Sequence, residues 1–313
     1  MDDKEKQAKE YLDKFLGGEQ NDNIGGGSIP PTYSDIIPES TAGFLNVPLE
    51  MLPCGIFYKN GTKIKIRAAK VWEVQSYSVV DSTNYLDITE KMNDMLSTCV
   101  KVIHSNGMNG SYKDLKDGDR IFLIFMIREL TFQEGNSLAK DVVCELCKTE
   151  FKIPFRATPG PNAPKTFVNY EMDETLKRFF DKDLKVFQFE IDGKVHRLAP
   201  PTIGLQEIFF KDIKSKVQEE KKPNVSFLKI IPYLLWDRST ITEEGIKSKE
   251  KDFKNLSMKE FQALNKSVDL MLFGVKELIS VCPECGQEVR TDLTFPDGAA
   301  NIFVDSDPFS NIL

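Results

Sequence analysis

Apolar positions recur at helical spacing in the first half of the chain. The clearest helix is predicted over residues 89–103, where a single apolar stripe repeats at steps of three and one. Asp87 and Glu90 form a capping box at its start, and Gly107 marks its end. A second helix is predicted over about 115–130, and because its later half is almost wholly apolar, we expect protein to surround it. The stripe of the first helix consists of Met92, Met95, Leu96, Cys99, Val100 and Ile103.

Alternating apolar positions predict strands before and after these helices. Residues 55–67 indicate a β-hairpin with an Asn-Gly turn, and residues 185–198 indicate a second with an Asp-Gly turn. Single alternating strands are predicted over 150–155 and 288–295. The chain therefore mixes helices and strands from one end to the other.

Helical spacing returns between the second hairpin and the last strand. Helices are predicted near 203–220, 225–236 and 257–279. Ser257 and Glu260 form a capping box at the start of the third of these helices.

Four of the six cysteines form two Cys-x-x-Cys pairs, Cys144 with Cys147 and Cys282 with Cys285. Two intervening residues let both thiolates of a pair point at one centre, and Gly286 permits the tight backbone of such a turn. Each pair also leads into a predicted strand. A Cys pair followed by a strand, found twice, is the arrangement of a zinc ribbon, although the usual spacing between the pairs is 15–20 residues. The two halves of this ribbon would therefore come from distant parts of the chain.

Two other interpretations of the pairs stay open. A redox Cys-x-x-Cys is one, but such pairs stand at helix N-termini, which lower the thiol pKa, whereas both pairs here lead into strands. Unrelated turns are the other. Zinc explains the pattern best, and four thiolates would leave no coordination position for water, so we predict one structural Zn²⁺ per chain. We expect Cys54, in a turn, and Cys99, on an apolar helix face, to be structural.

Composition and patterning together divide the chain into five parts. We expect an α+β fold, in which a mixed helical domain with a β-hairpin is joined to a discontinuous four-Cys zinc ribbon that carries a large α/β insertion. The parts are an N-terminal helix with a Gly/Pro-rich arm (1–46), an α+β domain ending in the first Cys pair (47–156), an inserted, mainly helical domain (157–275), the second Cys pair that completes the ribbon (276–298) and an extended C-terminal tail (299–313).

Charge and sequence signals narrow the class of protein. A net charge of −7 argues against a general nucleic-acid binder, and the second Cys pair is itself flanked mainly by acidic residues. The first residues lack the apolar core of a signal peptide, and the most apolar run, 121–127, is too short to cross a bilayer. We therefore expect a soluble protein of a reducing cytoplasm, with no membrane partner and no specific nucleic-acid partner.

The sequence offers no catalytic or cofactor-binding residue. His104 and His196 are the two histidines, and neither stands in a known nucleophile arrangement. The glycines at 25–27 do not form a phosphate loop, because no strand precedes them and no Gly-Lys-Ser/Thr follows. We expect a protein that is not an enzyme and takes no small-molecule substrate.

Both ends of the chain carry spaced apolar residues in polar segments that cannot fold alone. Residues 17–32 and 299–313 lack a periodic apolar face, yet Ile29, Tyr33, Phe303 and neighbouring apolar residues are costly to leave in water. We expect these segments to lie across neighbouring subunits of an assembly. The alternative is that they dock onto their own domain.

A succession of short motifs covers roughly residues 51–156 and 277–297. Its members are Leu52-Pro53-Cys54-Gly55 with Tyr58, Ile64-Lys65-Ile66-Arg67, Glu73 opening a helical region, Cys99 on its helix, Asp119-Arg120 before the apolar helix, and the two Cys pairs. This succession resembles the baseplate hub proteins of contractile-tailed, T-even-like bacteriophages. The segment 157–275 and the N-terminal arm depart from the compact form of that family.

The resemblance implies a structural or assembly role without catalysis. It implies a component of the viral tail baseplate, hub or wedge, that binds other baseplate subunits through its N-terminal arm and C-terminal tail. Such a protein resides in the virion and, during assembly, in the host cytoplasm. A zinc-ribbon adaptor in a transcription or nucleoprotein complex is the alternative, and a thiol oxidoreductase is a third class.

Overall fold

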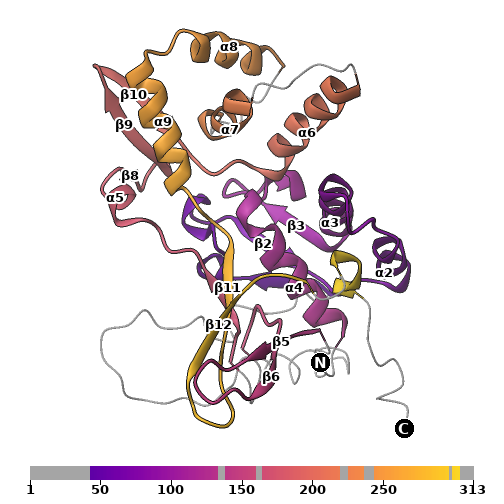
Figure 1. Ribbon diagram of the computed structural model, residues 1–313. Helices are drawn as coiled ribbons and strands as arrows, with labels where there is room; N and C mark the ends of the chain where they lie inside the picture. The colour runs from indigo at the N-terminus through magenta and orange to yellow at the C-terminus, as the bar shows by residue number, and fades with distance from the viewer. Residues whose placement is uncertain are drawn as a thin grey trace.

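The computed structural model describes residues 43–132, 138–159, 164–218, 225–235, 243–295 and 298–303. These residues form helices and four small antiparallel sheets, which confirms a mixed α+β fold (Figure 1). Helices α6 to α9 gather at the top of Figure 1, α4 lies in the middle, and two hairpins reach the bottom. The predicted N-terminal helix and most of the arm lie outside the described residues.

The first sheet has the order β1 (Leu45–Val47), β2 (Lys63–Ile66), β3 (Val100–Ile103) and β4 (Asn109–Gly110). The hairpin predicted over 55–67 is wrong, because β2 pairs with β1 on one side and β3 on the other.

A 3-10 helix, η3 (Gly55–Phe57), takes the place of the hairpin's first strand. The reason is the buried carboxylate of Asp119, which accepts hydrogen bonds from the backbone N–H of Cys54 (2.7 Å) and the hydroxyl of Tyr58 (2.6 Å). These two anchors hold the segment between them as a tight turn. The turn is also closely packed against the residues before it, since a Cβ on Gly55 would meet the Leu49 carbonyl oxygen at 1.7 Å.

Helix α3 (Tyr85–Cys99) has the predicted length but is shifted by four residues toward the N-terminus. Asn84 caps it, with a side chain that accepts from the N–H groups of Leu86 and Asp87, so the predicted capping box is wrong. Val100 begins β3, because the β-branched residues that continue the apolar stripe pair with β2.

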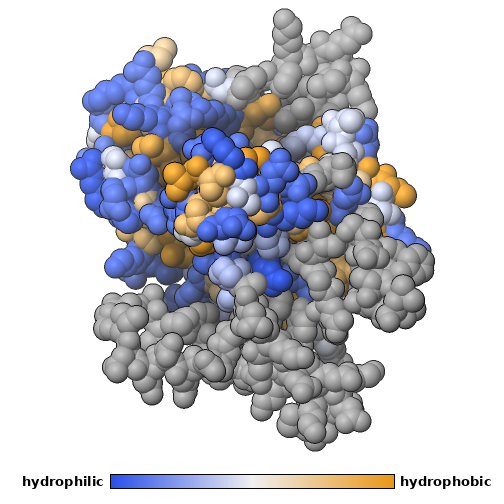
Figure 2. Space-filling view, turned by 60° about the horizontal axis from the view of Figure 1, so that its bottom comes forward, coloured by the Kyte–Doolittle hydropathy of each residue, from blue (hydrophilic) through white to orange (hydrophobic). Residues whose placement is uncertain are grey.

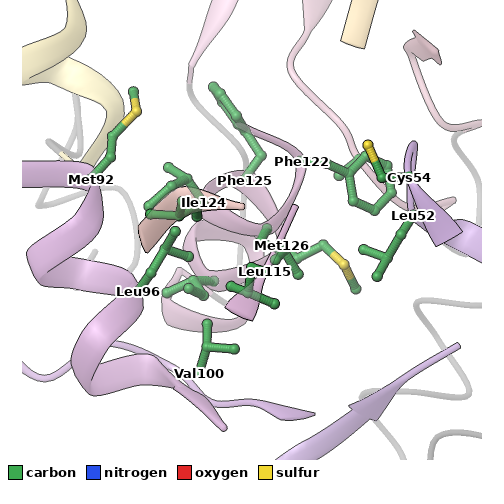
Figure 3. Close-up of a cluster of buried hydrophobic side chains, with 14 of the residues drawn as sticks. Leu52, Cys54, Met92, Leu96, Val100, Leu115, Phe122, Ile124, Phe125 and Met126 are labelled. Carbon is green, nitrogen blue, oxygen red and sulfur yellow. The ribbon is translucent and has the colours of Figure 1, made fainter. Parts of the chain in front are cut away.

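Helix α4 (Arg120–Thr131) begins later than predicted, because two 3-10 turns, η4 (Tyr112–Asp114) and η5 (Asp117–Asp119), precede it. Nine of its twelve residues are buried, which confirms that protein surrounds it. Figure 3 shows α4 side chains such as Phe122 and Ile124 between Leu96 of α3 and the turn that holds Cys54. Helix α2 (Val71–Ser78) packs beside α3.

The second half of the chain begins with β7 (Phe167–Asn169) and the short helix α5 (Glu174–Lys177). The second predicted hairpin is confirmed as β9 (Val186–Ile191) and β10 (Lys194–Leu198), with β8 (Phe180–Asp181) as a third strand. Asp192 and Gly193 have φ of 51° and 76°, values that suit an Asp-Gly turn between two strands. The helices that follow are α6 (Ile203–Gln218), α7 (Val225–Leu234), α8 (Glu243–Lys254) and α9 (Met258–Leu270).

Helix α9 starts as predicted and ends early. The capping box of Ser257 and Glu260 is present, but the helix stops at Leu270 rather than 279. Gly274 has φ of 131°, outside the helical range, and the chain then extends as β11 (Val275–Val281). Strand β11 pairs with β7 and with β12 (Glu288–Asp292), so backbone pairing replaces the last helical turns.

Segment 157–275 shares a core with the first part of the chain. The ring of Phe57 lies 4.8 to 5.6 Å from those of Phe180, Phe187 and Phe273. A smaller apolar cluster between α6 and α7 consists of Leu205, Phe209, Ile231 and Leu235. No helix in the described ranges is both long and apolar enough to cross a membrane.

The beginning of the predicted extended tail is a 3-10 helix, η7 (Ala299–Phe303), packed on the chain's own core. Ile302 and Phe303 are fully buried, and the ring of Phe303 lies 5.0 Å from that of Tyr77 on α2. The guanidinium of Arg128 donates to the Ile302 carbonyl. For these five residues the expectation of an extended segment is wrong, because burying two large apolar side chains outweighs leaving them exposed. Residues 304–313 lie outside the described part.

Candidate metal centre

Each Cys pair lies in the turn of an antiparallel hairpin. The first hairpin is formed by β5 (Ala139–Val143) and β6 (Glu150–Pro154), and the second by β11 and β12. Cys144 donates its N–H to the Thr149 carbonyl at 2.9 Å, and Cys282 donates to the Gln287 carbonyl at 2.8 Å. The two strand pairs are thus closed by equivalent hydrogen bonds on the first cysteine of each pair.

The two turns also share a backbone shape. The N–H of Lys148 donates to the Cys144 carbonyl, and that of Gly286 donates to the Cys282 carbonyl, at 2.9 and 3.0 Å. Lys148 has φ of 62° and Gly286 φ of 71°, so the residue after the second cysteine of each pair lies in the left-handed region. Glycine adopts this conformation freely, whereas a lysine does so at a cost. The equivalent geometry indicates that both turns serve the same purpose.

The structure brings all four predicted ligands together. The four sulfurs lie within 4.8 Å of one another, with 3.6 Å between Cys144 and Cys285 and 3.5 Å between Cys147 and Cys282. A disulfide would need about 2.05 Å. Four sulfurs around one tetrahedral ion at 2.3 Å stand about 3.8 Å apart. The cluster therefore has the dimensions of a metal site, and the cysteines are free thiols.

The site is half buried. Cys144 and Cys282 are buried, while Cys147 and Cys285 are exposed at the outer side. Hydrogen bonds with Thr149 lower the pKa of the Cys147 thiol to about 6, whereas the pKa of the neighbouring Cys285 thiol is raised to about 12 despite a backbone hydrogen bond from Gln287. Thiolate is the form of cysteine that binds metals.

A metal ion here would connect two hairpins that are distant in sequence. The hairpins touch elsewhere too, since the Lys140 ammonium donates to the Asp292 carbonyl at 2.8 Å. Four thiolates would fill a tetrahedral sphere and leave no position for a reacting water. Within the described ranges, no second cluster of three or more metal-ligating side chains is found.

The two histidines lie apart from the cysteines, on other elements. His104 stands 3.3 Å from Asp114, and His196 stands 3.3 Å from Glu260, the capping residue of α9. Both carboxylates belong to capping boxes, in which Asp114 accepts the N–H of Ser111 and Glu260 accepts the N–H of Ser257. Cys54 and Cys99 are fully buried in the apolar core, and burial raises the pKa of the Cys99 thiol to about 11.

Sequence reasoning did not identify the buried polar node around Asp119. Burial raises the pKa of this carboxyl to about 7, although Tyr58 and the Cys54 N–H donate to it. The Tyr58 hydroxyl in turn accepts the N–H of Lys116 at 2.8 Å. The sequence does show an acid, Asp119, directly before an apolar helix. Its hydrogen-bond partners, however, lie more than 60 positions earlier in the chain, so the pattern does not identify them. The node organises the fold and lies apart from the metal centre.

The chain matches no protein-family model, and no curated protein or solved structure matches it. Support for a function therefore comes from the geometry of the cysteine cluster and from the residue patterns of the chain.

Proposed function

We propose that the protein is a structural subunit of a contractile phage tail baseplate. One zinc ion, bound to Cys144, Cys147, Cys282 and Cys285, would cross-link its two hairpins. The observation that carries the zinc part of the proposal is the convergence of four thiols from two equivalent hairpin turns, whereas the baseplate part rests on the sequence motifs that resemble the hub proteins. Zinc is the divalent ion that four-thiolate tetrahedral sites hold in most structural metal centres. The metal has a mechanical role and no part in a reaction.

The two hairpins then make one discontinuous zinc ribbon that carries an insertion. The chain leaves the first hairpin after β6 and returns to the second through β11. Strand β7, soon after the departure, pairs with β11, so the exit and the return lie side by side. Zinc would fix this junction, and segment 157–275 would extend from it.

The baseplate assignment is supported by the positions of the residues that resemble the hub proteins. Cys54, Tyr58 and Asp119 come from two separate motifs and meet in one buried node. Residues in such a node stabilise the fold and take no part in a reaction. This fits a resemblance to the hub proteins that lies in the fold. Its partners would be other baseplate subunits.

A zinc-ribbon adaptor of a nucleoprotein complex fits the charge less well. Glu145, Glu284 and Glu288 flank the cysteines in the sequence against Lys148, and Arg290 is engaged by Glu277 and Glu288. Phosphates would be repelled from this end of the molecule.

The metal is tested by analysis of purified protein. We expect about one zinc per chain with four sulfur neighbours near 2.3 Å by X-ray absorption. Cys282→Ser should lose most of this zinc on dialysis against a chelator and lower the melting temperature, because metal binding contributes to folding. Cys99→Ala, which removes a buried thiol outside the cluster, should retain the zinc. Metal-free native protein, or a Cys144–Cys147 disulfide, would refute the zinc assignment.

The assembly is tested on phage particles. We expect the protein to co-purify with intact tails and an antibody against it to label the baseplate in electron micrographs. Tails from an infection in which the gene is disrupted serve as the control. Absence from the particle together with nanomolar binding to duplex DNA at physiological salt would instead support the nucleoprotein adaptor.

A further inference from the structure

A cleft of about 700 Å³ separates β5 of the first hairpin from β12 of the second. Its walls include consecutive residues, 141–143 on β5 and 288–291 on β12. The face of a strand presents every second residue, whereas its edge presents consecutive ones. Both walls are therefore strand edges, and the cleft is a slot between two open sheets.

The hydrogen-bonding pattern leaves these edges unpaired. Strand β5 pairs with β6 and β12 pairs with β11, each at the edge of its sheet. The bonds donated by Cys144 and Cys282 to their hairpin partners set the alternation along the strands. The N–H groups of Val143 and Arg290 consequently point away from those partners. In the described part of the chain they meet no backbone acceptor outside the hairpins.

An apolar patch lies at the cysteine end of the slot. Val143 and Leu146 are 52% and 69% exposed, and both line the cleft. Each directly precedes a cysteine of the first pair, so this patch lies beside the cysteine cluster. Figure 2, in which the bottom of Figure 1 comes forward, shows a few orange residues enclosed by blue ones on this side. Large apolar side chains exposed together indicate a binding surface.

The slot is also acidic. Asp141, Glu145 and Glu288 line it against the guanidinium of Arg290, which contacts Glu288 at 2.8 Å and Glu277 at 2.7 Å, and the ammonium of Lys152 lies 3.9 Å from Asp141. A basic partner would gain attraction here, and a nucleic acid would be repelled. At the end remote from the cysteines, the contact of Lys140 with the Asp292 carbonyl ties the two edges together.

We propose that this slot binds an extended segment of a partner protein by strand addition, with lysine or arginine alternating with apolar residues. Main-chain hydrogen bonds to both edges would join the two sheets into one, and the apolar side chains would cover Val143 and Leu146. The proposal goes beyond the baseplate assignment and holds for any assembly that contains this chain.

The test uses the full zinc-bound chain and a blocked heptapeptide of alternating lysine and valine. Titration followed by NMR should show saturable binding, with slowed exchange of the amide protons of Val143 and Arg290. A peptide of the same sequence with alternate backbone nitrogens methylated should bind about tenfold more weakly, because it loses main-chain donors at unchanged charge. Val143→Pro should weaken the unmodified peptide similarly and by more than Val143→Thr, which alters the apolar side chain but keeps the main-chain N–H.

Zinc content is measured on every sample, so loss of the metal centre is told apart from loss of peptide binding. Equal affinity for the methylated peptide would overturn strand addition, whether or not Val143→Pro folds. Equal affinity for a glutamate–valine peptide, or binding of a DNA oligonucleotide to the same amides, would overturn the basic partner. Binding that leaves both amides unprotected would place the peptide elsewhere and also overturn the proposal.

Discussion

Asp119 is fully buried, and its carboxylate is held by the Cys54 N–H and the Tyr58 hydroxyl. Burial raises its pKa to about 7, above the value near 4 of an unfolded aspartate. The folded state therefore holds a proton that the unfolded state releases. The resulting stability is fully present below about pH 4 and is lost as pH rises to about 7.

We expect Asp119→Asn to flatten this pH dependence. Between about pH 4 and 7 the wild type should lose on the order of 3 kcal/mol of unfolding free energy through Asp119, and the variant should not. Denaturant unfolding across this range measures the difference. Asp183→Asn, at an exposed position, is the matched control and should keep the wild-type profile. Burial also raises the pKa of Glu129 to about 7. The unfolding free energy of the variant therefore still falls with pH, through Glu129, over this range.

Among the elements, η7 shows how a terminal segment becomes part of the core. Gly298 precedes it with φ of 89°, and a Cβ there would meet the Ser82 side chain at 2.7 Å. The Ser82 hydroxyl accepts the N–H of Ala300 at 3.0 Å. The turn at Gly298 thus lets Ile302 and Phe303 enter the core beside α2 and α4.

Two truncations separate the docked part of the tail from the rest. Deleting 299–313 should lower the unfolding free energy by on the order of 3–6 kcal/mol, because Ile302 and Phe303 each lose their burial. Deleting only residues 304–313 should leave the unfolding free energy nearly unchanged while weakening incorporation of the protein into the phage tail. Equal stability of the two truncated proteins would show that η7 contributes little to the core.

At the scale of the whole molecule, the cysteine cluster lies outside the main apolar core. That core is centred on α4, and its buried residues do not include the four cysteines. Removing zinc with a chelator should therefore accelerate amide exchange in β5, β6, β11 and β12 and leave α4 protected. Exchange measured by mass spectrometry before and after chelation, with zinc restored as the control, tests this. Loss of protection in α4 would mean that the metal holds the entire fold.

The sequence by itself determined the features that depend on neighbours within a few residues. The Cys-x-x-Cys spacing identified four thiols that the fold brings together, and the apolar run of α4 predicted its burial. The Asp192-Gly193 turn and the Ser257 capping box were found because their hydrogen bonds are local. In each case the residues that form the structure are adjacent in the chain.

Only the tertiary structure decided the features that depend on distant partners. Strand β2 pairs with β1 and β3 rather than with residues just before it, because Asp119 holds those residues in a turn. The apolar residues after Cys99 and after Gly274 become strands because open strand edges lie beside them. A periodic pattern records which side of an element is apolar. It does not record which edge or pocket is free to receive that element, and this is settled only when the whole chain packs.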